Sequence, residues 1–168
     1  MNIKQLISES SLIYSNKRIN EAILDIAEKC NLKLTNQKVT VLPIMKGALI
    51  FSGQLIPKLN FQCQIDYIHA SRYQNNKGKK VVNWLYQPHL DLIKDQIVLI
   101  IDDILDEGLT LSDIKIKLID MGAKEVLTVV LFDKKIDKIK PITANFFGLD
   151  VPDAYVYGFG LDFKGIGR

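Results

Sequence analysis

Cysteine is scarce in this sequence of 168 residues, which contains only Cys30 and Cys63. The two show no spacing typical of a metal site, so we expect reduced core thiols of a cytoplasmic protein. Long hydrophobic runs are missing as well. Nowhere do about 18 apolar residues follow one another, and residues 1–14 hold no sustained apolar segment. The sequence therefore predicts neither a membrane span nor a secretory signal.

A large excess of charge of one sign is also absent. Lysine and arginine together number 22 against 19 acidic residues, a net charge of +3. This net charge does not by itself indicate binding to nucleic acid. Two local basic clusters occur, at Lys77–Lys80 and Lys134–Lys140, and such runs are usually solvated faces.

Nearly half of the residues are apolar, 48%, and 24% are charged, as in an ordinary globular protein. The length predicts one domain over residues 1–168, without repeats or linkers. Helical and strand patterns alternate, which predicts an α/β fold. Helices are expected from near Asn16, over Gly47–Leu59 and from Thr110 to Met121. Strands are expected at Val39–Ile44, Gln64–Ala70, Val81–Tyr86, Ile97–Ile101 and Val126–Phe132, followed by short aromatic segments at Ala144–Leu149 and Tyr155–Phe159. The polar stretch Ser71–Lys80 is expected to be mobile.

The segment 97–111 is the most informative of the chain. Ile97–Ile101 is apolar throughout, as is typical of a strand buried on both faces of a parallel sheet. Asp102 and Asp103 follow it directly, at the edge where open α/β sheets bind ligands. The alternative is that the two acids only end the strand. Unpartnered burial of both carboxylates would be unfavourable, which favours a ligand.

The acids are followed by a loop, Asp106–Thr110, that leads into a helix. A strand-to-helix loop turns backbone N–H groups toward one point, where the positive end of the helix dipole favours an anion. Gly108 allows close approach, and the Thr110 hydroxyl can donate a further hydrogen bond. The alternative for Thr110 is a simple helix cap. Carboxylates beside a phosphate loop indicate a sugar phosphate as the ligand.

This pattern resembles the phosphoribosyl-pyrophosphate signature of the type I phosphoribosyltransferases. The resemblance implies their fold: a central, mostly parallel sheet flanked by helices, with a flexible flap and a small hood formed mainly by about residues 141–168. Asp106 stands where the hypoxanthine-guanine branch carries Asp, which implies that it accepts a proton from the purine. The implied phosphoribosyl site comprises Asp102, Asp103, Ile104, Leu105, Asp106, Glu107, Gly108, Leu109 and Thr110. Glu107 is often Thr and Leu109 often Lys in the family, so we expect Glu107 to point outward.

Two further segments resemble motifs of the same family. Met45-Lys46-Gly47 resembles its pyrophosphate loop, with Lys46 and Gly47 facing the leaving group and often a cis peptide before the lysine. By itself this motif would favour a helix start with a solvated lysine. Ser71-Arg72-Tyr73 falls at the place of the flap, which excludes water from the reacting centre. Arg72 departs from the usual pattern, in which Ser directly precedes Tyr.

The carboxyl-terminal segment 151–162 resembles the base-binding segment of the hypoxanthine-guanine branch. The match implies that Tyr155 stacks on the purine and that the Val156 main chain reads its pyrimidine edge. Asp162 would hold a second magnesium, and Arg168 would reach the pyrophosphate. Without the resemblance, Tyr155–Phe159 would be interpreted as a core strand.

Lys134 follows the strand Val126–Phe132 and matches the lysine that donates to the 6-oxo group of the purine. A lysine at such a place is otherwise usually solvated. An ammonium donates and never accepts, so it favours a 6-oxo purine over adenine.

The resemblance implies an enzyme that moves the 5-phosphoribosyl group from phosphoribosyl pyrophosphate to hypoxanthine or guanine. It implies Mg²⁺, held at Asp102, Asp103 and Asp162, and a homodimer or homotetramer. The expected partners are small molecules rather than nucleic acid or membrane. Two alternatives remain: a xanthine-preferring transferase, and a regulator of the same fold that binds nucleic acid. A regulator requires a continuous basic face, for which Lys134–Lys140 is the candidate.

Overall fold

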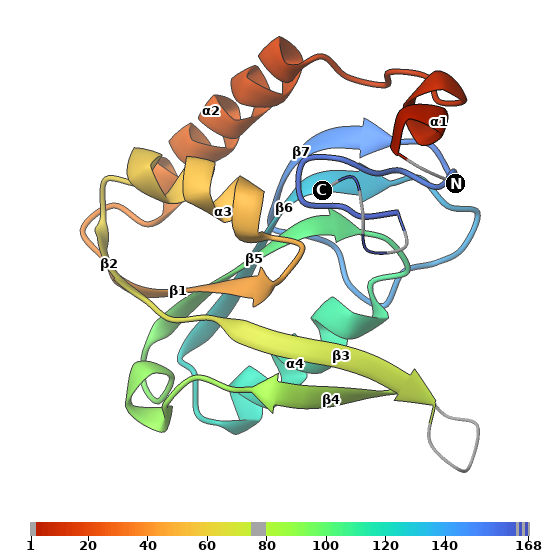
Figure 1. Cartoon of the computed structure of the whole chain (residues 1–168). Coiled ribbons are helices and arrows are strands. Elements are labelled where there is room, and N and C mark those ends of the chain that lie inside the picture. Colours follow the sequence, from red (N-terminus) through yellow and green to blue (C-terminus); the bar gives the residue numbers. More distant parts are fainter. Residues whose placement is uncertain (1–2, 75–79, 164, 166, 168) are drawn as a thin grey trace.

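The apolar run of the sequence forms the central strand of a mostly parallel sheet (Figure 1). β5 (Ile97–Leu105) pairs in parallel with β1 (Lys38–Met45) and β6 (Glu125–Lys134). The computed structural model describes residues 3–74, 80–163, 165 and 167. Within these residues the strand order is β4-β3-β1-β5-β6-β7, with β2 also paired to β1 and with β4 antiparallel. The predicted α/β fold with a mostly parallel sheet is confirmed.

The remaining elements connect and cover these strands. The other strands are β2 (Gln62–Ile65), β3 (Ile68–Gln74), β4 (Lys80–Tyr86) and β7 (Phe146–Val151). The helices are α1 (Ile3–Ser8), α2 (Asn16–Lys33), α3 (Leu49–Leu55) and α4 (Leu109–Asp120), with short 3-10 turns η1 (Ile56–Lys58) and η2 (Leu90–Leu92). Among the residues described, no helix is long and apolar enough to cross a membrane.

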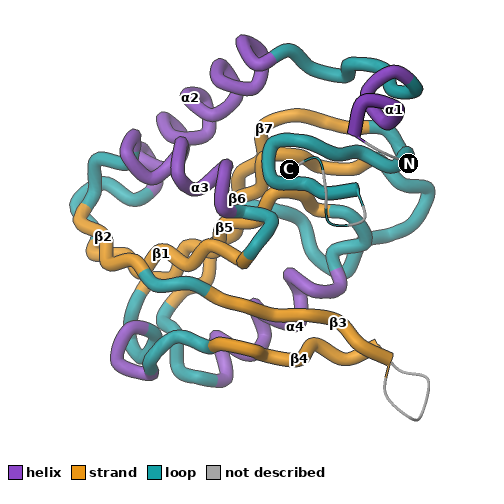
Figure 2. The backbone as a smooth tube through the Cα atoms, in the orientation of Figure 1, coloured by secondary structure: helices purple, strands orange, loops and turns teal. Residues whose placement is uncertain are grey.

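Alternate side chains of β5 pack against opposite helical layers, because successive residues of a strand point to opposite faces. Leu99 and Ile101 lie in the core cluster with α2 and α3. Val98 and Ile100 lie in the cluster with α4. Figures 1 and 2 show α2 and α3 on one side of the sheet and α4 on the other. Both faces of the central strand are therefore buried, as its unbroken apolar sequence predicted.

Two predicted helices differ in detail from those observed. The helix expected near Asn16 is confirmed, but its cap is Ser15, whose side chain accepts a hydrogen bond from the N–H of Arg18 at 3.2 Å. The helix expected over Gly47–Leu59 is shorter. Its regular part is α3, and a 3-10 turn containing Pro57 follows, because proline has no N–H and its ring clashes with the preceding turn.

The single strand expected at Gln64–Ala70 was wrong, since the chain forms β2 and β3 with a break between them. Both segments pair with β1 at different places along its length. At the break, the Asp66 carboxylate accepts hydrogen bonds from the N–H of Tyr67 at 2.8 Å and from the hydroxyl of Tyr86 at 3.1 Å. A side chain that bonds its own backbone in this way competes with the strand ladder.

The predicted hairpin strand Val81–Tyr86 is confirmed as β4, antiparallel to β3. The backbone of residues 71–74 belongs to β3, so this part of the polar stretch is strand and not loop, and its expected mobility stays a prediction. Residues 75–79 lie outside the described residues. β3 pairs with β1 only through Ile68 and His69, and the hairpin then extends beyond β1 (Figure 1).

After β7 the chain becomes irregular. The alternative interpretation of Tyr155–Phe159 as a core strand was wrong, because φ is positive at Gly158 (93°), Phe159 (55°) and Gly160 (106°). These angles turn the backbone, and Gly158 and Leu161 form an isolated bridge. The hood expected over about residues 141–168 stays a prediction, although Phe146–Val151 itself belongs to the central sheet.

Candidate active site

The two acids lie inside β5 and not after it, because the strand continues to Leu105. An Asp102 carboxylate oxygen accepts from the N–H of Asp103 at 3.0 Å, and an Asp103 oxygen accepts from the N–H of Ile104 at 2.9 Å. Asp103 is buried, with 8% of its surface exposed. Burial, and next the charge of Asp103, raise the pKa of Asp102 well above its usual value. The rigid strand therefore holds two carboxylates that a cation or sugar hydroxyls would stabilise.

The predicted phosphate loop connects β5 to α4. Gly108 caps the helix in the left-handed region with φ of 76°, a conformation that other residues adopt only with strain. An added Cβ at Gly108 would lie 3.1 Å from the Ile142 side chain. The loop thus places the first N–H groups of a twelve-residue helix, and Thr110, toward one cavity.

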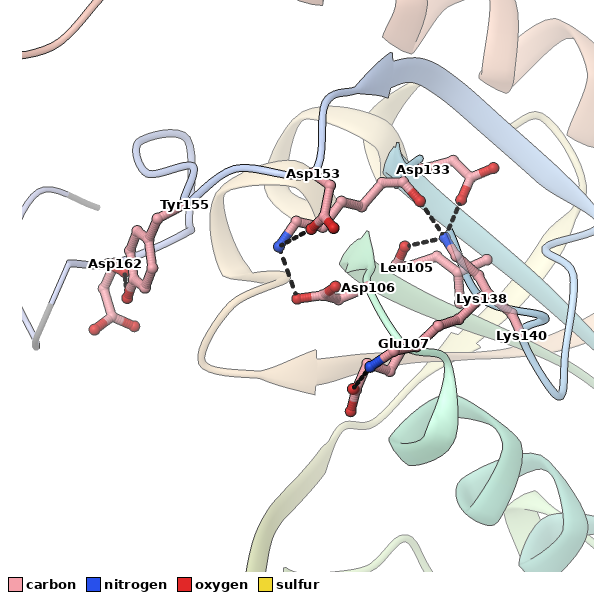
Figure 3. A network of polar contacts seen from close by, with 10 residues as sticks. Leu105, Asp106, Glu107, Asp133, Lys138, Lys140, Asp153, Tyr155 and Asp162 are labelled. Carbon is pink, nitrogen blue, oxygen red and sulfur yellow. Dashed lines mark hydrogen bonds and ion pairs between the residues drawn. The ribbon is translucent and has the colours of Figure 1, made fainter. Parts of the chain in front are cut away.

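That cavity has a volume of about 860 Å³ and is lined by all nine of the predicted phosphoribosyl residues. Its lining comprises Ile44, Gly47, the whole segment from Asp102 to Leu111, Lys134, Ile136, Asp137, Lys138 and Asp153. Glu107, which was expected to point outward, is half-exposed at the cavity and lies 3.8 Å from the ammonium of Lys138 (Figure 3). Its negative charge is thus offset beside the place predicted for the phosphate.

The predicted proton acceptor and the predicted purine lysine lie together in the same cavity. The Lys134 ammonium donates to a carboxylate oxygen of Asp106 at 3.2 Å and lies 3.9 Å from Asp153. Lys134 is mostly buried, with 13% of its side chain exposed, whereas Asp106 is 50% exposed. A cation and a carboxylate are therefore presented side by side, a donor next to an acceptor.

The loop after β1 packs directly on the acids. The Met45–Lys46 peptide is cis, as the resemblance suggested, and Lys46 is exposed. A Cβ at Gly47 would lie 2.2 Å from an Asp103 carboxylate oxygen, so only glycine fits there. A Cβ at Gly160 would lie 2.2 Å from the Gly47 carbonyl oxygen. The carboxyl-terminal segment, the Gly47 loop and Asp103 thus form three layers in close contact.

The other residues predicted for the purine and the second metal lie outside the cavity lining. Tyr155 is 67% exposed and donates through its hydroxyl to the Asp162 carbonyl oxygen at 2.9 Å. The Asp162 carboxylate accepts from the N–H of Gly165 at 2.5 Å. Val156 packs against the main core cluster. Figure 3 shows Tyr155 and Asp162 to one side of the group around Asp106.

The remaining predicted site residues are Arg168 and the three flap residues. Arg168 lies outside the described residues. The flap residues Ser71, Arg72 and Tyr73 belong to β3 by their backbone and pair with Asn83, Val82 and Val81. Their predicted roles, and those of Lys46, Tyr155, Val156 and Asp162, stay predictions.

Sequence reasoning missed several polar residues around this cavity. Within the cluster Lys134–Lys140, Lys134 was assigned to the purine and the run as a whole was interpreted as a solvated face. That interpretation is wrong for Lys140, which, like Lys134, has 13% of its side chain exposed. Lys140 binds Asp133, and Lys138 faces Glu107. Asp153 belongs to the carboxyl-terminal motif, but no role was assigned to it from the sequence. Their spacing in the sequence carries no signal, because the contacts join separate strands and loops.

The residues present fit a magnesium ion that shares its ligands with a substrate. Asp102 and Asp103 supply the carboxylate oxygens that Mg²⁺ prefers. Across the described part of the chain, no three acidic, histidine or cysteine side chains gather as a complete metal site. Mg²⁺ commonly uses one or two carboxylates and completes its shell with water and substrate phosphates, which matches this pair.

Comparison with known proteins agrees with this geometry. The family model of the phosphoribosyl transferase domain matches residues 9–164, and the chain belongs to this family. Among its relatives is the hypoxanthine-guanine phosphoribosyltransferase of Mycoplasma genitalium, 32% identical over 163 residues, with 94% of this chain and 90% of that protein covered. The enzyme of the same name from Aquifex aeolicus is 29% identical over 167 residues, covering 99% and 90%.

Solved structures show the same fold. A hypoxanthine-guanine phosphoribosyltransferase from Bacillus anthracis superposes with a TM-score of 0.85 at 26% identity, covering 95% of this chain and 92% of that one. A hypoxanthine phosphoribosyltransferase from Staphylococcus aureus gives a TM-score of 0.88 at 24% identity, covering 100% and 91%. Within the family, the chain's relatives thus lie in the hypoxanthine-guanine group.

Proposed function

We propose that the protein is an enzyme of purine salvage that transfers the 5-phosphoribosyl group from phosphoribosyl pyrophosphate to hypoxanthine or guanine. The products are the purine ribonucleoside monophosphate and pyrophosphate. The observation that carries the proposal is the Asp106–Lys134 pair, separated by 3.2 Å in the cavity that also contains the phosphate loop.

The pair is complementary to one edge of a 6-oxo purine. N7 and O6 lie side by side on that edge. The Asp106 carboxylate accepts the N7 proton while N9 attacks the anomeric carbon, and the Lys134 ammonium donates to O6. Adenine would place an amino donor against the ammonium, so this arrangement disfavours it.

The other end of the cavity holds the donor substrate. The loop residues Asp106–Thr110 bind the 5′-phosphate through backbone N–H groups, and Asp102 and Asp103 accept from the ribose hydroxyls. Their negative charge stabilises a transition state in which the ribose becomes cationic. Fixing both substrates in one cavity replaces a chance encounter by an oriented one.

Magnesium belongs to the proposal, with Asp102 and Asp103 as candidate ligands of one ion and Asp162 as the candidate ligand of a second. When bound, it would neutralise the pyrophosphate and make it a better leaving group. Lys46, Gly47 and Arg168 are proposed to bind the same pyrophosphate. Tyr155 and Val156 are proposed to bind the purine, with Ser71, Arg72 and Tyr73 covering the site.

The proposal also includes an assembly and a cellular location. A homodimer or homotetramer is supported by two exposed apolar side chains of α3, Leu49 and Ile50, which are 55% and 41% exposed. A cytoplasmic location is supported by Cys30 and Cys63, which are both free thiols.

A nucleic-acid-binding regulator is disfavoured by the charges around the basic cluster. Lys134 faces Asp106, Lys135 faces Asp133 and Asp150, and Lys138 faces Glu107. Lys140 binds Asp133 as well. Carboxylates thus balance the positive charge of Lys134–Lys140, the candidate face for such a regulator.

The test is a side-by-side assay of hypoxanthine, guanine, xanthine and adenine with phosphoribosyl pyrophosphate and magnesium. We expect monophosphate formation from hypoxanthine or guanine and little from adenine. Preference for xanthine would establish the alternative transferase. No turnover with any 6-oxo purine would refute the enzymatic proposal.

A further inference from the structure

Lys140 lies behind the candidate purine site, in the connection between β6 and β7. Its ammonium donates to the Leu105 carbonyl oxygen at 2.7 Å, to an Asp133 carboxylate oxygen at 2.6 Å and to the Lys134 carbonyl oxygen at 2.6 Å. A lysine ammonium has three donors, and all three are used here. Only 13% of the side chain is exposed, and Figure 3 shows Lys140 in contact with Leu105 and Asp133.

The three acceptors belong to the last residues of two adjacent strands. Leu105 is paired with Asp133 at the end of the β5–β6 ladder. The next residue on one side is Asp106, and on the other it is Lys134. Beyond this pair no ladder bond is formed between the two strands within the described residues. The Lys140 ammonium therefore connects β5 and β6 just where the hydrogen-bonded ladder between these two strands ends.

The carboxylate of this group is held from two sides. Asp133 receives hydrogen bonds from Lys140 at 2.6 Å and from Lys135 at 3.0 Å. Partial burial would raise its pKa, but these two lysines hold the pKa below its usual value. Lys135 is 54% exposed and contacts neither Leu105 nor the Lys134 carbonyl in the contacts described. The two lysines thus share one carboxylate, but only Lys140 bridges the strands.

We propose that Lys140 is a positioning residue for purine recognition, which sets the separation between the Asp106 carboxylate and the Lys134 ammonium. The inference rests on the proposed function, in which these two groups bind N7 and O6 of the purine. A displacement of about 1 Å in such a pair can lower the rate by roughly 100-fold. Phosphoribosyl pyrophosphate is proposed to bind through backbone N–H groups of the adjoining loop and through Asp102 and Asp103, and none of these contacts requires a set separation between the Asp106 and Lys134 side chains.

The test compares Lys140→Met with Lys140→Arg and with the matched control Lys135→Met. Lys140→Met keeps the length of the side chain and removes its donors. We expect kcat/KM for the purine to fall about 10- to 100-fold, with KM for phosphoribosyl pyrophosphate little changed. Lys140→Arg keeps the charge and several donors, and should recover part of the loss. Lys135→Met removes the other partner of Asp133 and should keep near-native kinetics.

Melting temperatures of all variants set an assay temperature at which each is folded. Equal losses in Lys140→Met and Lys135→Met, or an equal rise of KM for both substrates, would overturn the proposal. A crystal structure of Lys140→Met supplies a measurement independent of turnover. We expect the Asp106–Lys134 separation to change from 3.2 Å, and an unchanged separation would overturn the proposal even if the native protein did not act on purines. Inactivity of the native protein on all purines would instead refute the proposed function.

Discussion

The ammonium of Lys134 lies 3.2 Å from the carboxylate of Asp106, although the two residues stand 28 positions apart in the chain. The contact joins the ends of β5 and β6, and without a ligand each group satisfies the other. A purine that binds between them must replace this ion pair by equivalent bonds to both groups. A base that offers only one of the two bonds leaves a mostly buried charge unsatisfied, which is unfavourable.

Replacement of Asp106 should separate chemistry from binding of the donor substrate. Asp106→Asn keeps the size of the side chain but cannot accept a proton. We expect kcat with hypoxanthine to fall about 10²- to 10⁴-fold, the usual contribution of a general base. Phosphoribosyl pyrophosphate affinity, measured by calorimetry, should change little. Asp120→Asn at the exposed end of α4 is the control. If the affinity for phosphoribosyl pyrophosphate fell sharply while kcat at saturating substrate stayed near the native value, the proton-transfer role assigned to Asp106 would be wrong.

Replacement of Lys134 should reduce selectivity among purines. Lys134→Met removes the donor to O6, and a hydrogen bond to a charged group contributes about 1.5–3 kcal/mol. We therefore expect kcat/KM for hypoxanthine to fall about 10- to 100-fold, and the fall for adenine to be smaller. The measurement is the ratio of the two specificity constants. Lys29→Met, on an exposed part of α2, serves as the control. Equal losses for both bases would contradict a role in recognising the 6-oxo group.

Asp102 should make the ligand-free protein less stable as the pH rises. Burial and the nearby Asp103 charge raise the pKa of Asp102 in the folded state. Between the unfolded and folded values, the folded protein therefore binds more protons than the unfolded one. Its stability should fall as the pH increases through that interval, which begins near the ordinary Asp value of about 4.

Asp102→Asn removes this dependence. We expect a higher melting temperature at neutral pH, where 1 kcal/mol corresponds to about 2–4 °C for a domain of this size. The additional stabilisation by magnesium and phosphoribosyl pyrophosphate, and the turnover, should both decrease. Calorimetric scans across pH, with and without these ligands, measure both effects. A variant that melts lower than the native protein at neutral pH would show that the carboxylate stabilises the empty fold.

Alanine substitutions at three glycines test how tightly the layers around Asp103 are packed. Gly47→Ala places a Cβ 2.2 Å from the Asp103 carboxylate, and Gly160→Ala places one 2.2 Å from the Gly47 carbonyl at a φ of 106°. Each should destabilise the fold by about 1–3 kcal/mol and lower turnover. Gly53→Ala, in α3 with nothing within 4 Å, is the matched control. It should stabilise the protein by roughly 0.5–1 kcal/mol.

Thermal unfolding and steady-state assays of the three variants provide the comparison. Native-like turnover in Gly47→Ala would show that the loop after β1 can move away from Asp103 without consequence. A loss in Gly53→Ala as large as in Gly160→Ala would show that the effects arise from alanine in general.

The sequence predicted the fold well where local pattern decides it. The unbroken apolar run of β5 required burial on both faces, and the structure places helices on both. It could not predict the break between β2 and β3, because the Asp66 side chain there binds Tyr67 and Tyr86 in place of the ladder. Nor did the pattern show where β5 ends, since Asp102 and Asp103 continue the strand despite their charge.

The site was predictable only in part for a related reason. Asp106 and Lys134 were assigned from motif resemblance, and their contact depends on the parallel pairing of β5 with β6. Lys140 carries no local signal, because its three acceptors come from two other segments of the chain. Tyr155 and Asp162 lie on either side of a glycine-rich turn with positive φ angles at residues 158–160, where periodicity no longer predicts the direction of a side chain.

The short attachment of β3 to β1 has a consequence for hydrogen exchange. β1 and β3 share two residue pairs, whereas β5 and β6 share eight. Beyond Ile68 and His69, the described contacts of β3 and β4 are their mutual ladder and the packing of Ala70 and Trp84 against the core cluster that includes α4. We expect the amide hydrogens of β3 and β4 to exchange with solvent by local opening. The amide hydrogens of β5 should exchange only when the whole protein unfolds. Asp102 and Asp103 would then stand on the slowest-exchanging strand, separated by β1 from a hairpin that opens independently.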